Sequence, residues 1–213
     1  MPKKLLIYLL ILLGKLWSYL HSFKTSEKIG VIKVILFSAW ISREFKSFGK
    51  GSMIYSFSSF LGGEFISIGT KCTIGKRTVL TAWRNSGSDT FMPQIIIGNN
   101  VSIGHDSHIT AINRIEIGNN VLAGKNITVT DNAHGKSNFK FMLLPPDRRP
   151  LYSAGPVIIE DGVWIGDKVT ILPNVRIGKN AIIGANAVVT RDIAANCVAG
   201  GIPARVIKLI EKT

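Results

Sequence analysis

Residues 159–189 read IEDGVWIGDKVTILPNVRIGKNAIIGANAVV, and an aliphatic residue returns at every sixth position of this stretch. These first residues of the hexads are Ile159, Ile165, Ile171, Ile177, Ile183 and Val189. An α-helix requires a period near 3.6 and a half-buried strand a period of two, so a period of six predicts short strands separated by tight turns. Three such strands make one triangular coil, and stacked coils bury the aliphatic residues in a continuous core.

The same rhythm extends back to Ile68 and gives fifteen hexads, of which fourteen open with Ile, Leu or Val. Glycine follows the opening residue in nine of them, which suits a corner. The fifth position is small or branched, as in Thr78, Ser107, Val169, Ala181 and Ala187. We therefore predict an all-β solenoid of about five triangular coils.

The rhythm breaks after the hexads that begin at Leu80, Ile109 and Val129. Each of these is the third hexad of a coil, and subtracting the normal six residues leaves insertions of eleven, two and twenty-four residues. We expect all three insertions to leave the prism at one corner and to stack there, and we place the candidate functional site at this edge. His134 stands where the largest insertion begins.

The first fifty residues differ in composition from the rest. Leu5 to Leu13 is an unbroken apolar run, and nine Lys and Arg against two Glu give this segment +7 of the total charge of +13. The sequence shows no A-x-A-like cleavage site after the run, and Gly14, Lys15 and Ser18 interrupt it too early for an ordinary membrane-spanning helix. Two interpretations stay open: helices that pack on the main domain or a neighbouring subunit, or helices that lie in an anionic membrane interface.

The chain is therefore divided into a basic, apolar helical segment, residues 1–50, and a β-solenoid domain, residues 51–213, that carries the loop 135–158. The net charge of the whole chain, +13, predicts an anionic partner. Because the sequence contains no recognisable nucleic-acid-binding motif, we expect this partner to be a phospholipid surface or a phosphorylated small molecule. Cys72 and Cys197 lack CxxC spacing, which favours two small thiols in the core.

The hexads of the form [LIV]-G-x-x-[VAS]-x end in Val-Val-Thr-Arg-Asp-Ile (188–193) and Gly-Gly-Ile-Pro-Ala-Arg-Val-Ile (200–207). This run, over residues 66–210, resembles the hexapeptide-repeat acyltransferases, in particular the galactoside, maltose and serine acetyltransferase branch and the sugar O-acetyltransferases of polysaccharide assembly. The resemblance implies a left-handed parallel β-helix, an exception to the usual right-handed crossover. It also implies a homotrimer with active sites between neighbouring subunits, acetyl-CoA as the donor, and no metal.

In this branch the catalytic histidine precedes a long loop that ends in a Val-Trp-Ile-Gly hexad. Here Thr-Asp-Asn-Ala-His-Gly (130–135) precedes the loop, and Val163-Trp164-Ile165-Gly166 follows it. The resemblance therefore implies that His134 is the general base, because an imidazole can take a proton from a sugar hydroxyl near neutral pH. The resemblance also implies that the backbone N–H of Asp167 donates the hydrogen bond that stabilises the developing oxyanion.

The cations near the C-terminus suit the phosphates of the coenzyme. With the resemblance, the expected coenzyme-binding residues are Trp164, Gly166, Asp167, Gly184, Ala185, Thr190, Arg191, Arg205 and Lys208. On the acceptor side we expect His108 and Asn132, and the loop residues Phe139, Phe141, Arg148, Arg149 and Tyr152 suit a sugar ring. Asp106 stands where the galactoside and maltose enzymes carry an Asn, so it either orients His134 across the trimer interface or is a plain turn residue.

The expected function is acetyl transfer to a hydroxyl of a saccharide that builds a surface polysaccharide, with a small-molecule or lipid-linked acceptor. We expect a cytoplasmic protein that contacts the inner face of the membrane through residues 1–50. Three alternatives are a γ-carbonic-anhydrase-like zinc hydrolyase, with His105, His108 and His134 assembled between subunits, a serine O-acetyltransferase-like activity, and a non-catalytic scaffold.

Overall fold

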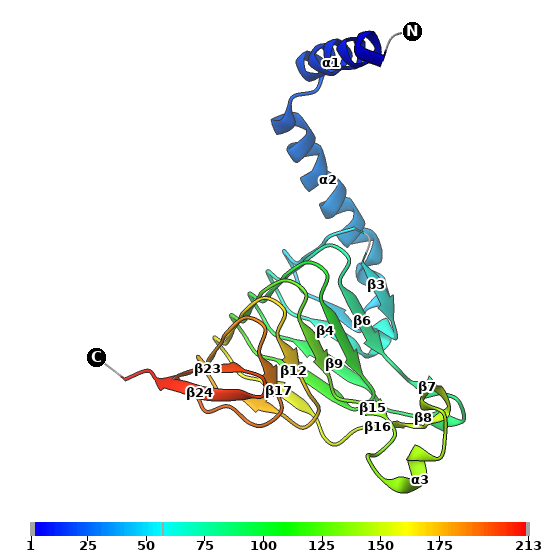
Figure 1. Cartoon of the computed structure of the whole chain (residues 1–213), viewed down its shortest axis with the longest axis vertical. Coiled ribbons are helices and arrows are strands. Elements are labelled where there is room, and N and C mark those ends of the chain that lie inside the picture. The colour runs from blue at the N-terminus through cyan, green and yellow to red at the C-terminus, as the bar shows by residue number, and fades with distance from the viewer. Residues whose placement is uncertain (1–2, 57, 212–213) are drawn as a thin grey trace.

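The computed structural model describes residues 3–56 and 58–211 and shows a triangular prism with two helices leaving one end (Figure 1). The helices are α1 (Lys3–Leu20) and α2 (Phe23–Ile41), followed by the 3-10 helix η1 (Ser42–Glu44). Along the prism the chain runs from the α2 end to the C-terminal strands at the opposite end (Figure 1). The predicted helical N-terminus and the β-rich remainder are both present.

Three sheets form the walls of the prism. The first sheet contains β1 (Ser47–Phe48), β4 (Ile66–Ile68), β9 (Gln94–Ile97), β12 (Arg114–Ile117), β17 (Val157–Ile159) and β20 (Arg176–Ile177). The second contains β2 (Met53–Ile54), β5 (Thr73–Ile74), β10 (Ser102–Ile103), β13 (Leu122–Ala123), β18 (Trp164–Ile165), β21 (Ile182–Ile183), β23 (Cys197–Gly201) and β24 (Ala204–Leu209). The third contains β3 (Ser59–Leu61), β6 (Val79–Ala82), β11 (His108–Ala111), β14 (Thr128–Thr130), β19 (Thr170–Ile171) and β22 (Val188–Val189).

Successive coils pair in parallel and in register, one strand per sheet. Phe48 lies opposite Ile68, Ile54 opposite Ile74, and Phe60 opposite Leu80. The fifteen predicted hexads occupy five of these coils, and the described strands add one complete coil ahead of them, β1 to β3. Because β1 already pairs with β4, the first prism strand begins ahead of the predicted boundary at residue 51.

The hexad openers form the core. Ile68, Ile97, Ile117, Ile159 and Ile177 stack on one another inside the first sheet, and all are at most 2% exposed. Burying each such side chain contributes about 1.5–3 kcal/mol. The fifth positions are buried as predicted, and the two polar ones, Thr78 and Ser107, donate to the carbonyl oxygens three residues earlier.

The glycine at the second hexad position is required for a different reason from the one expected, which was conformational freedom of the backbone. Gly69 does not need a positive φ; a Cβ there would lie 2.4 Å from the carbonyl oxygen of Gly98 in the next coil. The left-handed conformation falls instead two residues later, at positions such as Lys71, Asn100 and Asn120. Glycine is therefore required by the close approach of stacked coils.

We call the corner between the first and second sheets corner I, that between the second and third corner II, and that between the third and first corner III. The insertions all leave at corner III, as predicted. They carry the hairpin β7 (Asn85–Ser86) and β8 (Asp89–Thr90), and the loop with β15 (Ala133–His134), α3 (Phe139–Met142), the 3-10 helix η3 (Pro146–Arg148) and β16 (Leu151–Tyr152). Figure 1 shows both insertions gathered at one corner, and residues 86–89 and 147–150 line a shared groove. A shorter excursion at the same corner contains the 3-10 helix η2 (Gly63–Phe65).

The C-terminal half of α2 covers the open end of the first coil. Val34 and Ile41 are buried there, and the buried hydroxyl of Ser38 accepts a 2.8 Å hydrogen bond from the N–H of Ile54 while donating to the Val34 carbonyl. Strand β2 pairs with β5 on one side only, and the N–H of Ile54 on its outer edge thus finds a partner on a helix. This contact makes α2 a cap on the prism.

Replacing Ser38 by Ala is expected to lower the free energy of unfolding by about 1–2 kcal/mol, because the buried N–H of Ile54 would lose its partner. Ser42→Ala is the matched control, since the Ser42 hydroxyl bonds only within its own helix turn, and it should cost about 0.5 kcal/mol or less. Urea unfolding of the two variants checks this. Equal effects would show that the hydroxyl of Ser38 does not hold the cap.

The side chains of α1 that the structure describes, residues 3–19, are all exposed. Its apolar side chains from Leu5 to Trp17 are exposed, Tyr8 by 71% and Trp17 by 64%. Among the described residues, neither helix is long and apolar enough to cross a membrane alone. Lys3–Tyr19 and Lys24–Glu44, which are bent by 67° relative to each other, reach that length and apolar composition only as a pair.

Candidate active site

His134 lies on a short hairpin at corner III. It belongs to β15, which pairs antiparallel with β16, so that His134 stands opposite Leu151. The next residue, Gly135, has a φ of +78° and donates a 2.8 Å hydrogen bond to the Pro150 carbonyl. The His134 side chain is exposed in the single chain. The largest insertion therefore presents the predicted base at its root.

A buried carboxylate that the sequence pattern does not predict fixes the chain just before His134. The side chain of Asp131 is fully buried, and its two oxygens accept 2.9 Å hydrogen bonds from the N–H groups of Ile112 and Asn113 in the preceding coil. Burial raises the pKa of Asp131 above its ordinary value, and this effect outweighs the hydrogen bonds, which lower the pKa. The two-residue insertion at 112–113 supplies these donors, because it leaves the regular ladder.

Asn132 continues the same network. Its amide donates 3.1 Å hydrogen bonds to the Thr110 carbonyl and to Asp131, and its backbone exchanges hydrogen bonds with the Thr130 hydroxyl. The side chain predicted to bind substrate is thus engaged in holding the turn. Asn132 contributes to the position of His134 through these contacts.

The loop after His134 exposes the predicted ring-binding side chains unevenly. Phe139 is 77% exposed, whereas Phe141 and Arg149 lie against Gly135 and are half-buried. The ammonium of Lys136 lies 4.6 Å from the Tyr152 ring centroid, a cation–π contact across the hairpin. Arg148 is exposed beside the neighbouring insertion.

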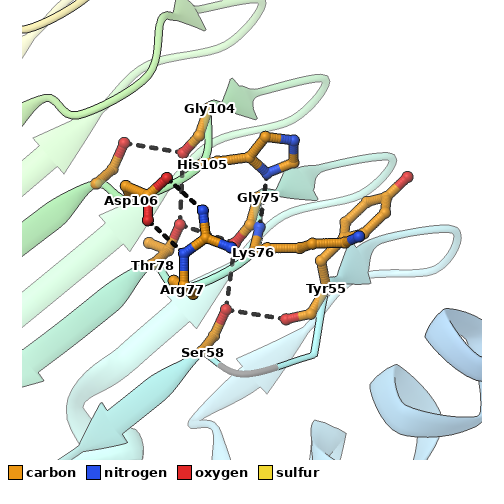
Figure 2. Close-up of polar contacts among 10 residues, drawn as sticks. Tyr55, Ser58, Gly75, Lys76, Arg77, Thr78, Gly104, His105 and Asp106 are labelled. Atoms are coloured by element: carbon orange, nitrogen blue, oxygen red, sulfur yellow. Dashed lines mark hydrogen bonds and ion pairs between the residues drawn. The ribbon is translucent and has the colours of Figure 1, made fainter. Parts of the chain in front are cut away.

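Asp106 lies at corner II, at the other end of strand β11 from the corner that carries His134. Its carboxylate accepts hydrogen bonds from Nε of Arg77 at 2.5 Å and from Nη2 at 2.7 Å (Figure 2). The Arg77 guanidinium holds the pKa of Asp106 below its ordinary value. Within one chain, therefore, Asp106 pairs with Arg77 and is not brought together with His134.

The other two histidines of the prism lie at a corner and on a sheet face. At corner II, Nδ1 of His105 accepts a 2.8 Å hydrogen bond from the N–H of Lys76 (Figure 2). His108 is exposed on the third sheet, in register with Val79 and Thr128. Among residues 3–56 and 58–211 of this single chain, no three His, Cys, Asp or Glu side chains are grouped to hold a metal ion.

The predicted coenzyme residues fall into two groups. Trp164 lies on the second sheet between Leu122 and Ile182 and is 52% exposed. Asp167, Gly184 and Ala185 lie at the adjoining corner II, and Arg205 and Lys208 lie on β24 of the second sheet. Thr190 and Arg191 lie at corner III instead, in a hollow with Pro156, Ile158 and Asp192.

At corner II some backbone N–H groups donate to the next coil and others do not. Gly166 and Gly184 donate theirs to the next coil, to Ile183 and Ala199. In the described chain no backbone hydrogen bond is donated by the N–H of Asp167, whose carboxylate accepts from the N–H of Lys125. The role of the Asp167 N–H as oxyanion donor stays a prediction.

Comparison with known proteins connects this architecture to a repeat family. The model "Bacterial transferase hexapeptide (six repeats)" matches residues 156–191. WbbJ of Escherichia coli K12, whose name assigns it to O-acetyl transfer in lipopolysaccharide biosynthesis, is 36% identical over 118 residues, which cover 54% of this chain and 60% of WbbJ. Galactoside O-acetyltransferase of the same organism is 36% identical over 124 residues, covering 53% of this chain and 56% of the enzyme.

Solved structures share the fold over most of the chain. A maltose O-acetyltransferase from Clostridium difficile 630 has a TM-score of 0.54 at 27% identity and covers 90% of this chain and 78% of its own. AntD, an N-acyltransferase from Bacillus cereus solved with coenzyme A, has a TM-score of 0.64 at 21% identity, covering 90% and 91%. The resemblance to hexapeptide-repeat acyltransferases is confirmed, and the chain spans just over half the length of the curated relatives it matches.

Proposed function

We propose that this chain, which carries the hexapeptide repeat of bacterial transferases, moves an acetyl group from acetyl-CoA to a hydroxyl of a saccharide. The observation that carries the proposal is the placement of His134 at the root of the largest loop, at the corner where the insertions stack. Similarity to galactoside and maltose O-acetyltransferases supports a saccharide acceptor. Similarity to WbbJ supports a building block of a surface polysaccharide.

We further propose that the prism, from β1 to β24, is a left-handed parallel β-helix and that it functions as a homotrimer. The candidate base lies at corner III, whereas Trp164, Asp167 and Asp106 lie on the second sheet or at corner II. One chain therefore cannot bring the full set together. Corner III of one subunit against corner II of the next would complete each site, and cyclic symmetry repeats that contact.

In this arrangement His134 takes the proton from the acceptor hydroxyl while the hydroxyl oxygen attacks the thioester carbonyl carbon. The N–H of Asp167 donates a hydrogen bond to the oxyanion that develops there. Collapse breaks the carbon–sulfur bond, and His134 returns the proton to the departing thiolate. No covalent enzyme intermediate is needed, so the protein contributes mainly positioning and charge stabilisation.

Asp106 would face His134 of the neighbouring subunit in such a trimer. Its bidentate pair with Arg77 keeps the carboxylate ionised and fixed, and a fixed carboxylate can orient an imidazole and stabilise its cation. His108 and the exposed loop side chains would line the acceptor space. Arg205, Lys208 and Arg191 would neutralise phosphates of the donor.

Calorimetric titration with acetyl-CoA tests the donor site without knowledge of the acceptor. We expect about one acetyl-CoA bound per chain. Arg205→Ala should raise the dissociation constant for acetyl-CoA about tenfold, because a charge-assisted hydrogen bond is lost. Lys179→Ala, which removes an exposed cation at corner I, is the matched control and should leave binding within about twofold. Absence of binding at millimolar donor would refute the transferase proposal.

Finally, we propose that α1 and the exposed N-terminal part of α2, within the predicted segment 1–50, contact the inner face of the cytoplasmic membrane. The support is the continuous exposed apolar surface of α1 together with the lysines on both helices. Apolar side chains would enter the lipid while the lysines meet anionic headgroups. A lipid-linked saccharide would then lie close to the prism.

A further inference from the structure

A groove runs between α2 and corner II at the end of the prism that α2 caps. Its polar lining residues are Ser26, Glu27 and Lys33 from α2 and Tyr55, Ser56 and Lys76 from the first two coils, and Gly30, Val31 and Val34 of α2 complete the lining. The polar side chains comprise two ammonium groups, three hydroxyls and one carboxylate. The groove offers hydrogen-bond donors and a net positive charge.

Two contacts at corner II place His105 beside the groove residues Lys76 and Tyr55. The N–H of Lys76 is bonded to Nδ1 of His105, so a neutral His105 carries its proton on Nε2, away from the backbone. The rings of Tyr55 and His105 meet edge to face, with centroids 6.1 Å apart. Figure 2 shows the Tyr55 hydroxyl, the Lys76 amine and the His105 ring extending to the same side of the corner.

The lysines of the groove are not used by the fold. In the part of the chain that the structure describes, the ion pairs are Arg77–Asp106, Arg114–Glu116 and Arg176–Glu160, and neither Lys33 nor Lys76 belongs to one. Both side chains are exposed. Because Arg77 already neutralises Asp106, the charge of Lys76 stays available to an anion.

We infer that this groove binds the phosphate of a membrane-anchored saccharide phosphate, the acceptor whose sugar reaches the site at Asp106. This inference rests on the proposed function and specifies its substrate class. A phosphate that joins a sugar to a lipid must lie between the membrane and the reacting hydroxyl, and the groove lies between α1 and Asp106. Coils are spaced about 5 Å apart, so Lys76 is one coil and Tyr55 two coils from Asp106, which leaves room for one or two sugar units.

The full chain can be tested with phosphatidylcholine vesicles that contain either a prenyl phosphate or phosphatidylglycerol at equal charge. The wild-type chain is expected to prefer the prenyl phosphate vesicles, and Lys33→Ala and Lys76→Ala should each reduce this preference about fivefold. Lys50→Ala is the matched control: it removes an exposed lysine from corner I of the first coil and should weaken binding to both vesicles equally. Thermal melting of each variant would check that it is folded.

Equal behaviour of Lys76→Ala and Lys50→Ala would overturn the inference, because it would reduce the groove to general surface charge. Displacement from prenyl phosphate vesicles by an equal concentration of free pyrophosphate would also overturn it, since the lipid would then add nothing. Because the vesicle assay needs no acetyl transfer, its failure is separable from a failure to bind acetyl-CoA. Binding to neither charged vesicle would overturn both the inference and the proposed membrane contact.

Discussion

His134→Ala is expected to lower kcat for acetyl transfer about 10²- to 10⁴-fold, the usual contribution of a general base, without changing the affinity for acetyl-CoA. The exposed side chain of His134 makes no contact on which the prism depends, so the melting temperature should stay that of the wild type. The measurement is the release of coenzyme A thiol with a saccharide that the wild-type enzyme accepts in a screen.

The control for this variant is Lys136→Ala. It removes the cation–π contact across the same hairpin and leaves the imidazole in place, so kcat should stay within about threefold. Together the two variants separate the chemistry of the base from disturbance of the loop. If His134→Ala retained more than about a tenth of the wild-type kcat, the assignment of the base would be wrong.

The second large effect is expected at Asp131. Asp131→Ala leaves the N–H groups of Ile112 and Asn113 without their partner, and at about 1–2 kcal/mol each the free energy of unfolding should fall by about 2–4 kcal/mol. The turn that leads to His134 would lose its anchor, and misplacing a base by about 1 Å can lower kcat about 10²-fold. The affinity for acetyl-CoA should be retained, because the second sheet and corner II are not attached to this turn.

Asp161→Ala is the matched control for Asp131. Its carboxylate also accepts hydrogen bonds from the backbone and side chain of the preceding coil, at Asn119, but it does so at corner I. It should lower stability and leave kcat unchanged. If both variants lost activity in proportion to stability, Asp131 would be a general structural residue with no specific effect on His134.

The stability contributed by Asp131 should also depend on pH. Burial raises its pKa in the folded state above the unfolded value of about 3.8, so the folded protein favours the protonated form. Its contribution is therefore complete below the unfolded pKa and declines as pH rises through the folded pKa. The difference in unfolding free energy between wild type and Asp131→Ala should be larger in acidic than in neutral buffer, as urea titrations at both pH values would reveal.

The sequence predicted the regular part of the prism because burial repeats there without interruption. The first coil was missed because its rhythm, Phe48, Ile54 and Phe60, contains aromatic openers and an offset of eight residues before Ile68. Asp131 was missed for a different reason: an acidic residue in a turn looks solvated in sequence. Only the stacking of one insertion on another shows that its carboxylate is enclosed by backbone donors.

The site was predictable to the extent that a long insertion marks one corner. The pairing of Asp106 with Arg77 was not, because the two residues are separated by 29 positions and meet only through coil stacking. The hydrogen bond from the Asn132 side-chain amide to the Thr110 carbonyl was unpredictable for the same reason, because it also joins stacked coils. Contacts between coils depend on insertion lengths, which the hexad pattern does not encode.

The cap formed by α2 bears on how the protein avoids polymerising. A stack of parallel strands ends in open backbone groups, and such an end is a template on which another molecule can add strands and grow into a fibril. At one end the hydroxyl of Ser38 accepts a hydrogen bond from the N–H of Ile54, and at the other end β24 folds back antiparallel along β23. Association end to end is thereby disfavoured, which leaves the side walls as the surfaces through which subunits can meet.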